Sequence, residues 1–224
     1  MAEKAICILG AGPGIGLSAA RKFGQIGYSV ALVARDEKKI NTFAEQLNQE
    51  GIEAIAIQGN AMANESVRKA IRITYDTFGR IDVLLYNAFT FRNELPSEMD
   101  PIEFAADMQV DVIGALTAYK SVLPLLKEGS SILFTGGGLG VKPMKAFTSV
   151  AVGKAAIRAL ALSIHQELKG KDIYAGTLTI NGFVKDDTHF SPENIAEKLF
   201  KMTEKRDQGE WTFDREPIKT SHNK

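Results

Sequence analysis

Short apolar runs and longer amphipathic stretches alternate along this chain. The apolar runs occupy residues 4–9, 29–34, 53–58, 81–86, 131–136 and 175–180. Both faces of these runs are apolar, which is typical of strands in a parallel sheet that is covered on two sides. The stretches between them, at 15–27, 36–51, 64–79 and 101–129, carry apolar residues at three- and four-residue spacing, with glycine near most ends. This alternation predicts an α/β fold: a single-domain, doubly wound parallel sheet of the Rossmann type with right-handed crossovers.

One packed domain accounts for nearly all of the sequence. A chain of 224 residues with 45% hydrophobic content is suited to a single large globular unit, and no internal repeat or low-complexity linker divides it. We place the domain at residues 1–214 and a polar C-terminal tail at residues 215–224.

The charge balance disfavours several classes of partner. Lysine plus arginine equal aspartate plus glutamate at 27 each, so no net field attracts nucleic acid or an anionic membrane. No apolar run reaches about 18 residues, and the N-terminus lacks the pattern of a signal peptide. The one cysteine, Cys7, lies between Ile6 and Ile8, which favours a buried, reduced thiol over a redox or metal site. We expect a soluble, cytoplasmic protein that binds neither nucleic acid nor membrane.

A glycine-rich turn follows the first predicted strand. Residues 10–16 read GAGPGIG. A strand, a glycine turn and a helix start present backbone amides and the positive end of a helix dipole to a pyrophosphate, which glycine allows to approach closely. A tight turn without a ligand is the alternative. The position after the first strand of an alternating α/β chain favours dinucleotide binding.

The second predicted strand ends at Ala34 and Arg35. In dinucleotide-binding folds a carboxylate at this position holds the adenosine ribose diol, whereas an arginine accommodates a 2′-phosphate. We expect Arg35 to contribute about 1.5–3 kcal/mol through a charge-assisted hydrogen bond to that phosphate, which favours NADP over NAD. The alternative is a solvated arginine that pairs with Glu37 or with nothing, and Asp36 directly follows it.

The order of these and later motifs resembles the short-chain dehydrogenase/reductase family over about residues 4–214. GAGPGIG is similar to the family's glycine motif, with Leu9 in place of the usual threonine. YNAF at 86–89 is similar to its Asn-Asn-Ala-Gly motif, with Tyr86 and Phe89 at the changed positions. SPENIAEKLF at 191–200 and GEWTFD at 209–214 resemble its last helix and last strand. The resemblance implies that domain 1–214 binds a dinucleotide, NADP rather than NAD. The implied cofactor-binding residues are Gly10, Gly12, Gly14, Ile15, Gly16, Arg35, Asn60, Ala61, Asn87, Ala88 and Lys154.

The same resemblance implies a catalytic set of asparagine, serine, tyrosine and lysine. In the family the tyrosine exchanges a proton with the substrate, and a lysine four residues later lowers the tyrosine pKa and binds the nicotinamide ribose. Lys154 matches the lysine, whereas Val150, Gly137 and Asp111 stand at the tyrosine, serine and asparagine positions. We therefore predict Lys154 and Asp111 as the remaining catalytic residues.

Valine supplies none of the roughly 10²–10⁴-fold rate contribution of a positioned general acid or base. Three hydroxyls could replace the tyrosine: Thr148, Ser149 and Tyr86. The simpler interpretation makes Thr148 and Ser149 the N-terminal cap of the helix that carries Lys154. It makes Tyr86 a core or strand aromatic whose hydroxyl reaches the surface. Asp111 could stay ionised beside Lys154 or act as a base, and an exposed helix carboxylate is the alternative.

Two further features bear on ligands. The segment at 181–191 keeps glycine at 182 but has Asn181 where the family usually has proline, and it is short, which predicts a truncated lid over the nicotinamide side. The histidines, at 165, 189 and 222, have no metal-ligand spacing, so we expect no metal site.

We interpret the chain as an NADP-dependent oxidoreductase that reduces a carbonyl-like group of an unidentified small molecule with a non-standard proton donor. The alternative is a catalytically silent NADP(H)-binding sensor or regulatory protein. A third interpretation, a scaffold with an empty pocket, requires that cofactor binding fails.

The sequence also predicts self-association. Residues 102–127 and 150–169 resemble the helix pair through which related proteins form a four-helix interface, and Ala155, Ala156 and Ala159 allow a close approach of backbones. We therefore expect a homodimer or homotetramer. The alternative is that these alanines only pack their helix onto its own sheet.

Overall fold

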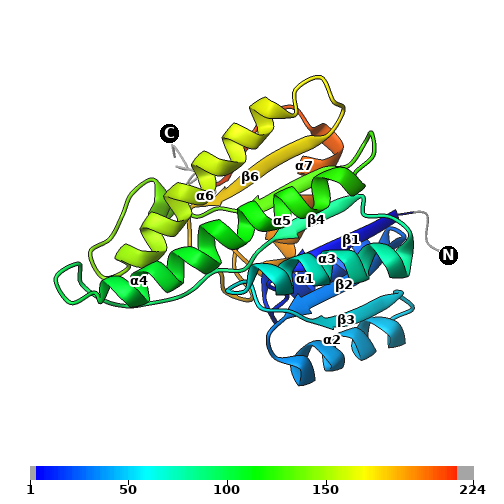
Figure 1. Ribbon diagram of the computed structural model, residues 1–224, viewed down its shortest axis with the longest axis horizontal. Helices are drawn as coiled ribbons and strands as arrows, with labels where there is room; N and C mark the ends of the chain where they lie inside the picture. Colours follow the sequence, from blue (N-terminus) through cyan, green and yellow to red (C-terminus); the bar gives the residue numbers. More distant parts are fainter. Residues whose placement is uncertain (1–3, 216–224) are drawn as a thin grey trace, which may run out of the picture.

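Seven parallel strands form the centre of the molecule in the computed structural model, which describes residues 4–215 (Figure 1). Their order across the sheet is β3-β2-β1-β4-β5-β6-β7. The strands are β1 (Lys4–Leu9), β2 (Tyr28–Ala34), β3 (Ala54–Gln58), β4 (Val83–Tyr86), β5 (Ser131–Thr135), β6 (Tyr174–Ile180) and β7 (Glu210–Phe213). The predicted doubly wound parallel sheet is confirmed. The predicted tail, apart from Arg215, and His222 lie outside the described residues.

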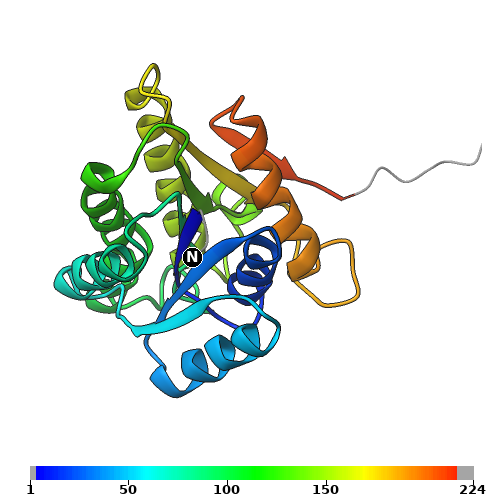
Figure 2. The same cartoon turned by 90° about the vertical axis from the view of Figure 1, so that its right-hand side faces the viewer.

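Helices cover both faces of this sheet. One layer contains α1 (Ile15–Gln25), α2 (Glu37–Gln49) and α7 (Pro192–Lys205), and the other contains α3 (Asn64–Phe78), α5 (Gly114–Val122) and α6 (Thr148–Glu167). The turned view in Figure 2 shows α1 and α7 on one side of the twisted sheet and the green α5 on the other. Two apolar cores therefore exist, one on each face.

The strands divide their side chains between these two cores. In β1, Ile6 and Ile8 belong to the core beneath α1, whereas Cys7 and Leu9 belong to the core beneath α3 and α5. This alternation explains why the central strands are apolar throughout, because neither face meets water. The edge strand β3 departs from the prediction: Ile55 is only half-buried, because a strand at the edge has incomplete cover.

The stretch at 101–129 is helical but not one regular helix. It consists of α4 (Pro101–Met108), a π-helical turn η1 (Gln109–Ile113), α5 and a short 3₁₀ turn η2 (Leu123–Leu125). The Tyr86 hydroxyl, at the end of β4, donates to the Val110 carbonyl inside the π-turn at 2.5 Å. A π-turn interrupts the regular series of backbone hydrogen bonds in a helix. A carbonyl inside it is therefore stabilised by a hydrogen bond from a donor outside the helix. Burial raises the Tyr86 pKa well above its usual range, so this hydroxyl stays a donor.

The carboxyl ends of β1 and β4 lie side by side at the point where the sheet reverses its winding. The chain passes from β1 outward to β2 and β3, then returns to β4 on the other side of β1. In doubly wound sheets the ligand crevice opens at this point. Gly10 there has φ of +88°, and a Cβ on it would lie 2.3 Å from the Ala88 nitrogen. Only glycine allows the loops after β1 and β4 to approach this closely.

Two further sequence expectations concern the Cys7 thiol and the lack of a membrane-spanning segment. Cys7 is fully buried, and burial raises the pKa of its thiol to about 11, as expected for an unreactive cysteine. Among residues 4–215, no helix combines the length and the apolar character that a membrane crossing requires.

Alanine substitutions at two glycines of the turn should have different effects on stability. Gly10→Ala should lower the free energy of unfolding by about 2–4 kcal/mol, because the new Cβ meets backbone atoms and the residue has a left-handed φ. Gly12→Ala should change it by less than about 0.5 kcal/mol, since no atom lies within 4 Å of the position of its added Cβ. Denaturant unfolding measures both, and equal losses would show that the turn is not packed as described.

Candidate functional site

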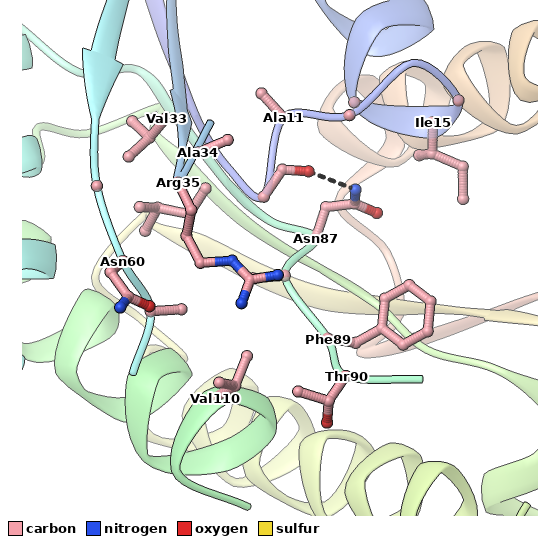
Figure 3. A pocket seen from close by; sticks show the side chains of 18 of the residues that line it. Ala11, Ile15, Val33, Ala34, Arg35, Asn60, Asn87, Phe89, Thr90 and Val110 are labelled. Carbon is pink, nitrogen blue, oxygen red and sulfur yellow. Dashed lines mark hydrogen bonds between the residues drawn. The ribbon is translucent and has the colours of Figure 1, made fainter. Parts of the chain in front are cut away.

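A cleft of about 410 Å³ opens at the carboxyl ends of β1, β2, β3 and β4 (Figure 3). Val184, from the loop after β6, and Val110, from η1, complete its wall. Of the predicted cofactor-binding residues it is lined by Gly10, Gly12, Gly14, Ile15, Gly16, Arg35, Asn60, Ala61, Asn87 and Ala88. Lys154, the remaining one, lines a separate chamber. The predicted residues thus line two neighbouring cavities, which share Ala88 and Phe89 as wall residues.

The glycine turn fits a pyrophosphate. The φ of Gly12 is not in the left-handed region, and its Cβ position is empty within 4 Å, so neither backbone strain nor packing demands glycine there. α1 begins directly after the turn with Gly14 at its N-cap, and no side chain caps it. Ile15 and Gly16, the first residues of α1, line the cleft, and the amides at a helix start lack partners within the helix and favour an anion.

Arg35 follows β2 at the edge of the cleft, and Figure 3 shows its guanidinium directed across the opening. Asp36, the neighbouring carboxylate, caps α2 by accepting from the Lys39 amide at 3.1 Å, and it also pairs with the Lys39 ammonium. Within residues 4–215 the guanidinium of Arg35 has no ion pair, and the alternative pairing with Glu37 does not form. The arginine is therefore available to a ligand.

Two asparagines hold the loops around the cleft. The Asn87 amide donates to the Gly10 carbonyl at 2.9 Å, which ties the loop after β4 to the glycine turn (Figure 3). The Asn60 side-chain oxygen accepts from the Met62 amide at 3.0 Å, and the Asn60 amide donates to Ser66. Both side chains are used for loop structure, so their contribution to a ligand is to shape the wall.

Beside the cleft lies a small chamber with about 10 Å³ of free space. Its polar wall comes from Lys154 and Asp111, with Thr135 and Tyr86, and its apolar wall includes Phe89. The space corresponds to about one water molecule. The two predicted catalytic residues are therefore brought together here, but away from the glycine turn.

Lys154 directs its ammonium into this chamber. Its Nζ donates to the Thr135 carbonyl at 2.8 Å and lies 4.7 Å from the centre of the Phe89 ring. Burial lowers the pKa of Lys154 to about 8, and the charge of Asp111 opposes that decrease. Lys154 thus stays mostly protonated at neutral pH, with a pKa close enough to neutrality for a proton donor.

Asp111 is buried in η1, so the alternative of an exposed helix carboxylate is wrong. One oxygen accepts from the Thr90 amide at 2.8 Å and from its hydroxyl at 3.2 Å. The other, Oδ2, has no hydrogen-bond partner among the described residues and lies against Gly153, where a Cβ would be 2.2 Å away. Burial raises the pKa of Asp111 to about 6, although the Thr90 hydrogen bonds and Lys154 act against it. No ion pair within 4 Å joins Asp111 to Lys154 in this part of the chain.

The three hydroxyls predicted as substitute donors have other partners. Ser149 donates to Asp107 at 2.6 Å, Thr148 donates to the Lys145 carbonyl, and Tyr86 serves the π-turn. Thr148 and Ser149 are not the cap of α6 either, because the N-cap is Phe147 and both residues lie inside the first turn. Val150 is buried and lines neither cavity. Tyr86 is a core aromatic, but its hydroxyl is buried against the Val110 carbonyl and does not reach the surface as the simpler interpretation expects.

A buried network that the sequence did not reveal anchors the loop after β4. Arg92 reaches Asp107 through two hydrogen bonds of 3.0 and 3.2 Å, and it also contacts Glu103. Burial alone would raise the pKa of Asp107, but hydrogen bonds from Arg92 and Ser149 hold it below its usual value. Asp107 and Asp111 are one helical turn apart, so both fix the segment that carries Phe89. No sequence motif signals this pairing.

The described residues contain no cluster of three or more histidine, cysteine or carboxylate side chains that could hold a metal ion. His165 lies beside the Ala175 carbonyl at 2.9 Å, and His189 stacks on Phe213. Both histidines therefore have structural neighbours in this region.

The comparisons with known proteins identify the family. The family model described as short chain dehydrogenase matches residues 4–191. An uncharacterized oxidoreductase from Staphylococcus epidermidis is 29% identical over 168 residues, which cover 74% of this chain and 72% of the relative. The chain therefore belongs to the short-chain dehydrogenase/reductase family of oxidoreductases.

Solved structures share the fold. A short chain dehydrogenase from Burkholderia cenocepacia in complex with NADP has a TM-score of 0.87 at 22% identity, covering 94% of this chain and 96% of that one. A short chain dehydrogenase/reductase from Burkholderia phymatum in complex with NAD has a TM-score of 0.87 at 17% identity, with coverages of 94% and 88%. Members with this fold thus occur with either cofactor.

The raised pKa of Asp111 predicts a pH-dependent stability. Below about pH 4 the carboxyl is protonated in both the folded and the unfolded chain, whereas above about pH 6 it is ionised in both, at a desolvation cost in the folded state. Its contribution should therefore lower the free energy of unfolding by about 2–3 kcal/mol as pH rises from 4 to 6.

Asp111→Asn should remove that slope, because the amide oxygen still accepts from Thr90 and carries no charge. Denaturant unfolding at several pH values measures the difference between the two proteins, which cancels the opposite slopes of the other carboxylates. Parallel curves for variant and parent would contradict a buried, ionising Asp111.

Proposed function

We propose that this chain is an NADP-dependent oxidoreductase that reduces a carbonyl-like group of a small molecule without the usual tyrosine. The observation that carries the proposal is the glycine-lined cleft with Arg35 across its opening. A guanidinium at the end of β2 suits a 2′-phosphate, and the neighbouring Asp36 is engaged in capping α2. The bound nicotinamide would supply the hydride. The free thiol of Cys7 supports a reducing, cytoplasmic compartment.

Lys154 and Asp111 are the titratable groups that could replace the tyrosine. Their pKa values of about 8 and about 6 bracket neutral pH, where a general acid or base is most effective. Lys154 would deliver the proton to the carbonyl oxygen of the ligand. The negative charge of Asp111 would then favour reprotonation of the Lys154 amine. The two hydroxyl-bearing residues on the chamber wall are engaged elsewhere, because Tyr86 donates to the Val110 carbonyl and Thr135 donates to the Tyr86 carbonyl.

A second candidate function is a catalytically silent NADP(H)-binding sensor. The specific observation is that Val150 is buried outside both cavities and that Gly137 offers no hydroxyl. Consumption of NADPH in the presence of aldehydes, ketones, quinones or imines separates the two functions. Binding without consumption favours the sensor.

We further propose a homodimer or homotetramer formed through α5 and α6. Ile113 just before α5, Leu116 on α5 and Val152 on α6 are large apolar residues at least 40% exposed. Ala155 and Ala159 on α6 are exposed as well, so they do not pack onto the chain's own sheet. Small and apolar residues on two adjoining helices suit a close helical interface.

The cofactor preference gives the first test. NADP(H) should raise the melting temperature more than NAD(H), because Arg35 can meet the extra phosphate. Arg35→Asp should weaken NADP binding by about ten- to hundredfold and spare NAD. Lys38→Asp is the control, since it makes the same charge change at an exposed residue that does not line the cleft. Equal increases in melting temperature with the two cofactors would contradict the NADP preference.

The proposed interface gives the second test. Replacement of Leu116 and Val152 together by glutamate should convert the assembly into a 24.4 kDa monomer, because four charges would be buried per pair of subunits. Ile26→Glu, a comparable change on an exposed residue after α1, should leave the assembly intact. Sedimentation velocity at micromolar concentration measures the mass, and a parent protein that is already monomeric refutes the interface.

The missing hydroxyls give the third test. Gly137→Ser with Val150→Tyr should raise carbonyl reductase activity by about 10²–10⁴-fold, because a general acid returns one helical turn from Lys154. A Cβ on Gly137 meets the Lys154 stem at an ordinary 3.5 Å, so serine fits there. Gly137→Ser with Val150→Phe adds the same bulk without the phenol and should gain nothing. Equal activities of the two variants would show that the phenol is not used.

A further inference from the structure

Phe89 separates the cleft from the Lys154–Asp111 chamber. The two cavities have only Ala88 and Phe89 as common wall residues, and Phe89 has the only large side chain of the two. Figure 3 shows the Phe89 ring at the end of the cleft opposite Asn60. A ligand that extends from the glycine turn toward Lys154 therefore meets this ring first.

The backbone around Phe89 is fixed, whereas its ring is held weakly. Asn87, two residues before, is bonded to Gly10, and Thr90, the next residue, is bonded to Asp111. Phe89 is 47% exposed. Its ring makes a cation–π contact with the Lys154 ammonium, which lies 4.7 Å from the ring centre. A partly exposed cation–π contact of this kind is worth about 0.5–2 kcal/mol. The ring can thus leave Lys154 by rotation of its side chain without movement of the loop.

We propose that Phe89 is a specificity-determining residue that restricts the resting cleft to the adenosine-phosphate half of a dinucleotide. The second half reaches Lys154 only when the ring has turned away, so full-length ligands lose binding energy to that displacement. This inference rests on the proposed dinucleotide function. It assigns Phe89 a role in ligand choice that the glycine turn and Arg35 do not fulfil.

The arrangement has a consequence for Lys154. While the ring is in place, the Lys154 ammonium is engaged by the Thr135 carbonyl and the ring face, and the chamber beside it holds about one water molecule. No ligand group of the size of a ribose can enter that space. Displacement of Phe89 therefore both admits the ligand and releases one contact of the lysine.

The test compares two probes, 2′,5′-ADP and NADPH, by isothermal titration calorimetry with the full chain. Phe89→Ala should tighten NADPH binding by about two- to thirtyfold, the range that corresponds to the lost cation–π contact. Binding of 2′,5′-ADP should stay the same, because this probe ends before Phe89. An unchanged 2′,5′-ADP affinity also shows that the variant is folded with an intact cleft.

Two further variants isolate the cause. Phe91→Ala removes a more exposed neighbouring aromatic that packs on Phe147 and lines neither cavity, so neither affinity should change. Against a Lys154→Met background, Phe89→Ala should give no gain for NADPH, because methionine has already removed the cation–π contact that holds the ring in place.

The outcomes separate the failure of this inference from failure of the proposed function. If neither probe binds the parent protein, the dinucleotide function itself is wrong. If 2′,5′-ADP binds and Phe89→Ala leaves NADPH affinity unchanged, the ring is no barrier and the inference is overturned. A weaker NADPH affinity in Phe89→Ala also overturns it, since the ring would then be a stacking surface for the ligand.

Discussion

The contact between Gly10 and the backbone at Ala88 is the constraint on which the site depends. It brings the loops after β1 and β4 together at the reversal point of the sheet, and the Asn87 amide fastens them through the Gly10 carbonyl. The Gly10 amide in turn donates to Val33 in β2 at 2.9 Å. Three strand ends are thereby joined; they form most of the cleft wall, and the chamber shares with them the end of β4 and the loop after it.

Local patterns were enough to predict the fold and the cleft. Parallel strands buried on two faces are apolar throughout, so β1 and β2 were visible as runs, and the glycine turn was visible because its function restricts residue type. Arg35 could be placed because it directly follows such a strand. These features depend on neighbours in sequence, which is why the sequence contains them.

The chamber could not be predicted, because its geometry depends on contacts between distant segments. The sequence alone suggests that Ser149 is a helix cap, whereas in the structure its hydroxyl donates a hydrogen bond to Asp107, 42 residues away. Tyr86 is a possible proton donor on sequence grounds, but in the structure its hydroxyl is bonded to the Val110 carbonyl in the π-turn. Phe89 was visible only as a departure from a family motif, and its place between two cavities follows from the packing of α6 against the loop after β4.

The closeness of Asp111 and Gly153 has a consequence for how such sites diverge. Because a single added carbon at 153 would occupy the space of the Asp111 carboxylate, the two positions cannot change independently. A lineage that acquires a side chain at 153 must first shorten or rotate residue 111, and one that keeps aspartate at 111 retains glycine at 153.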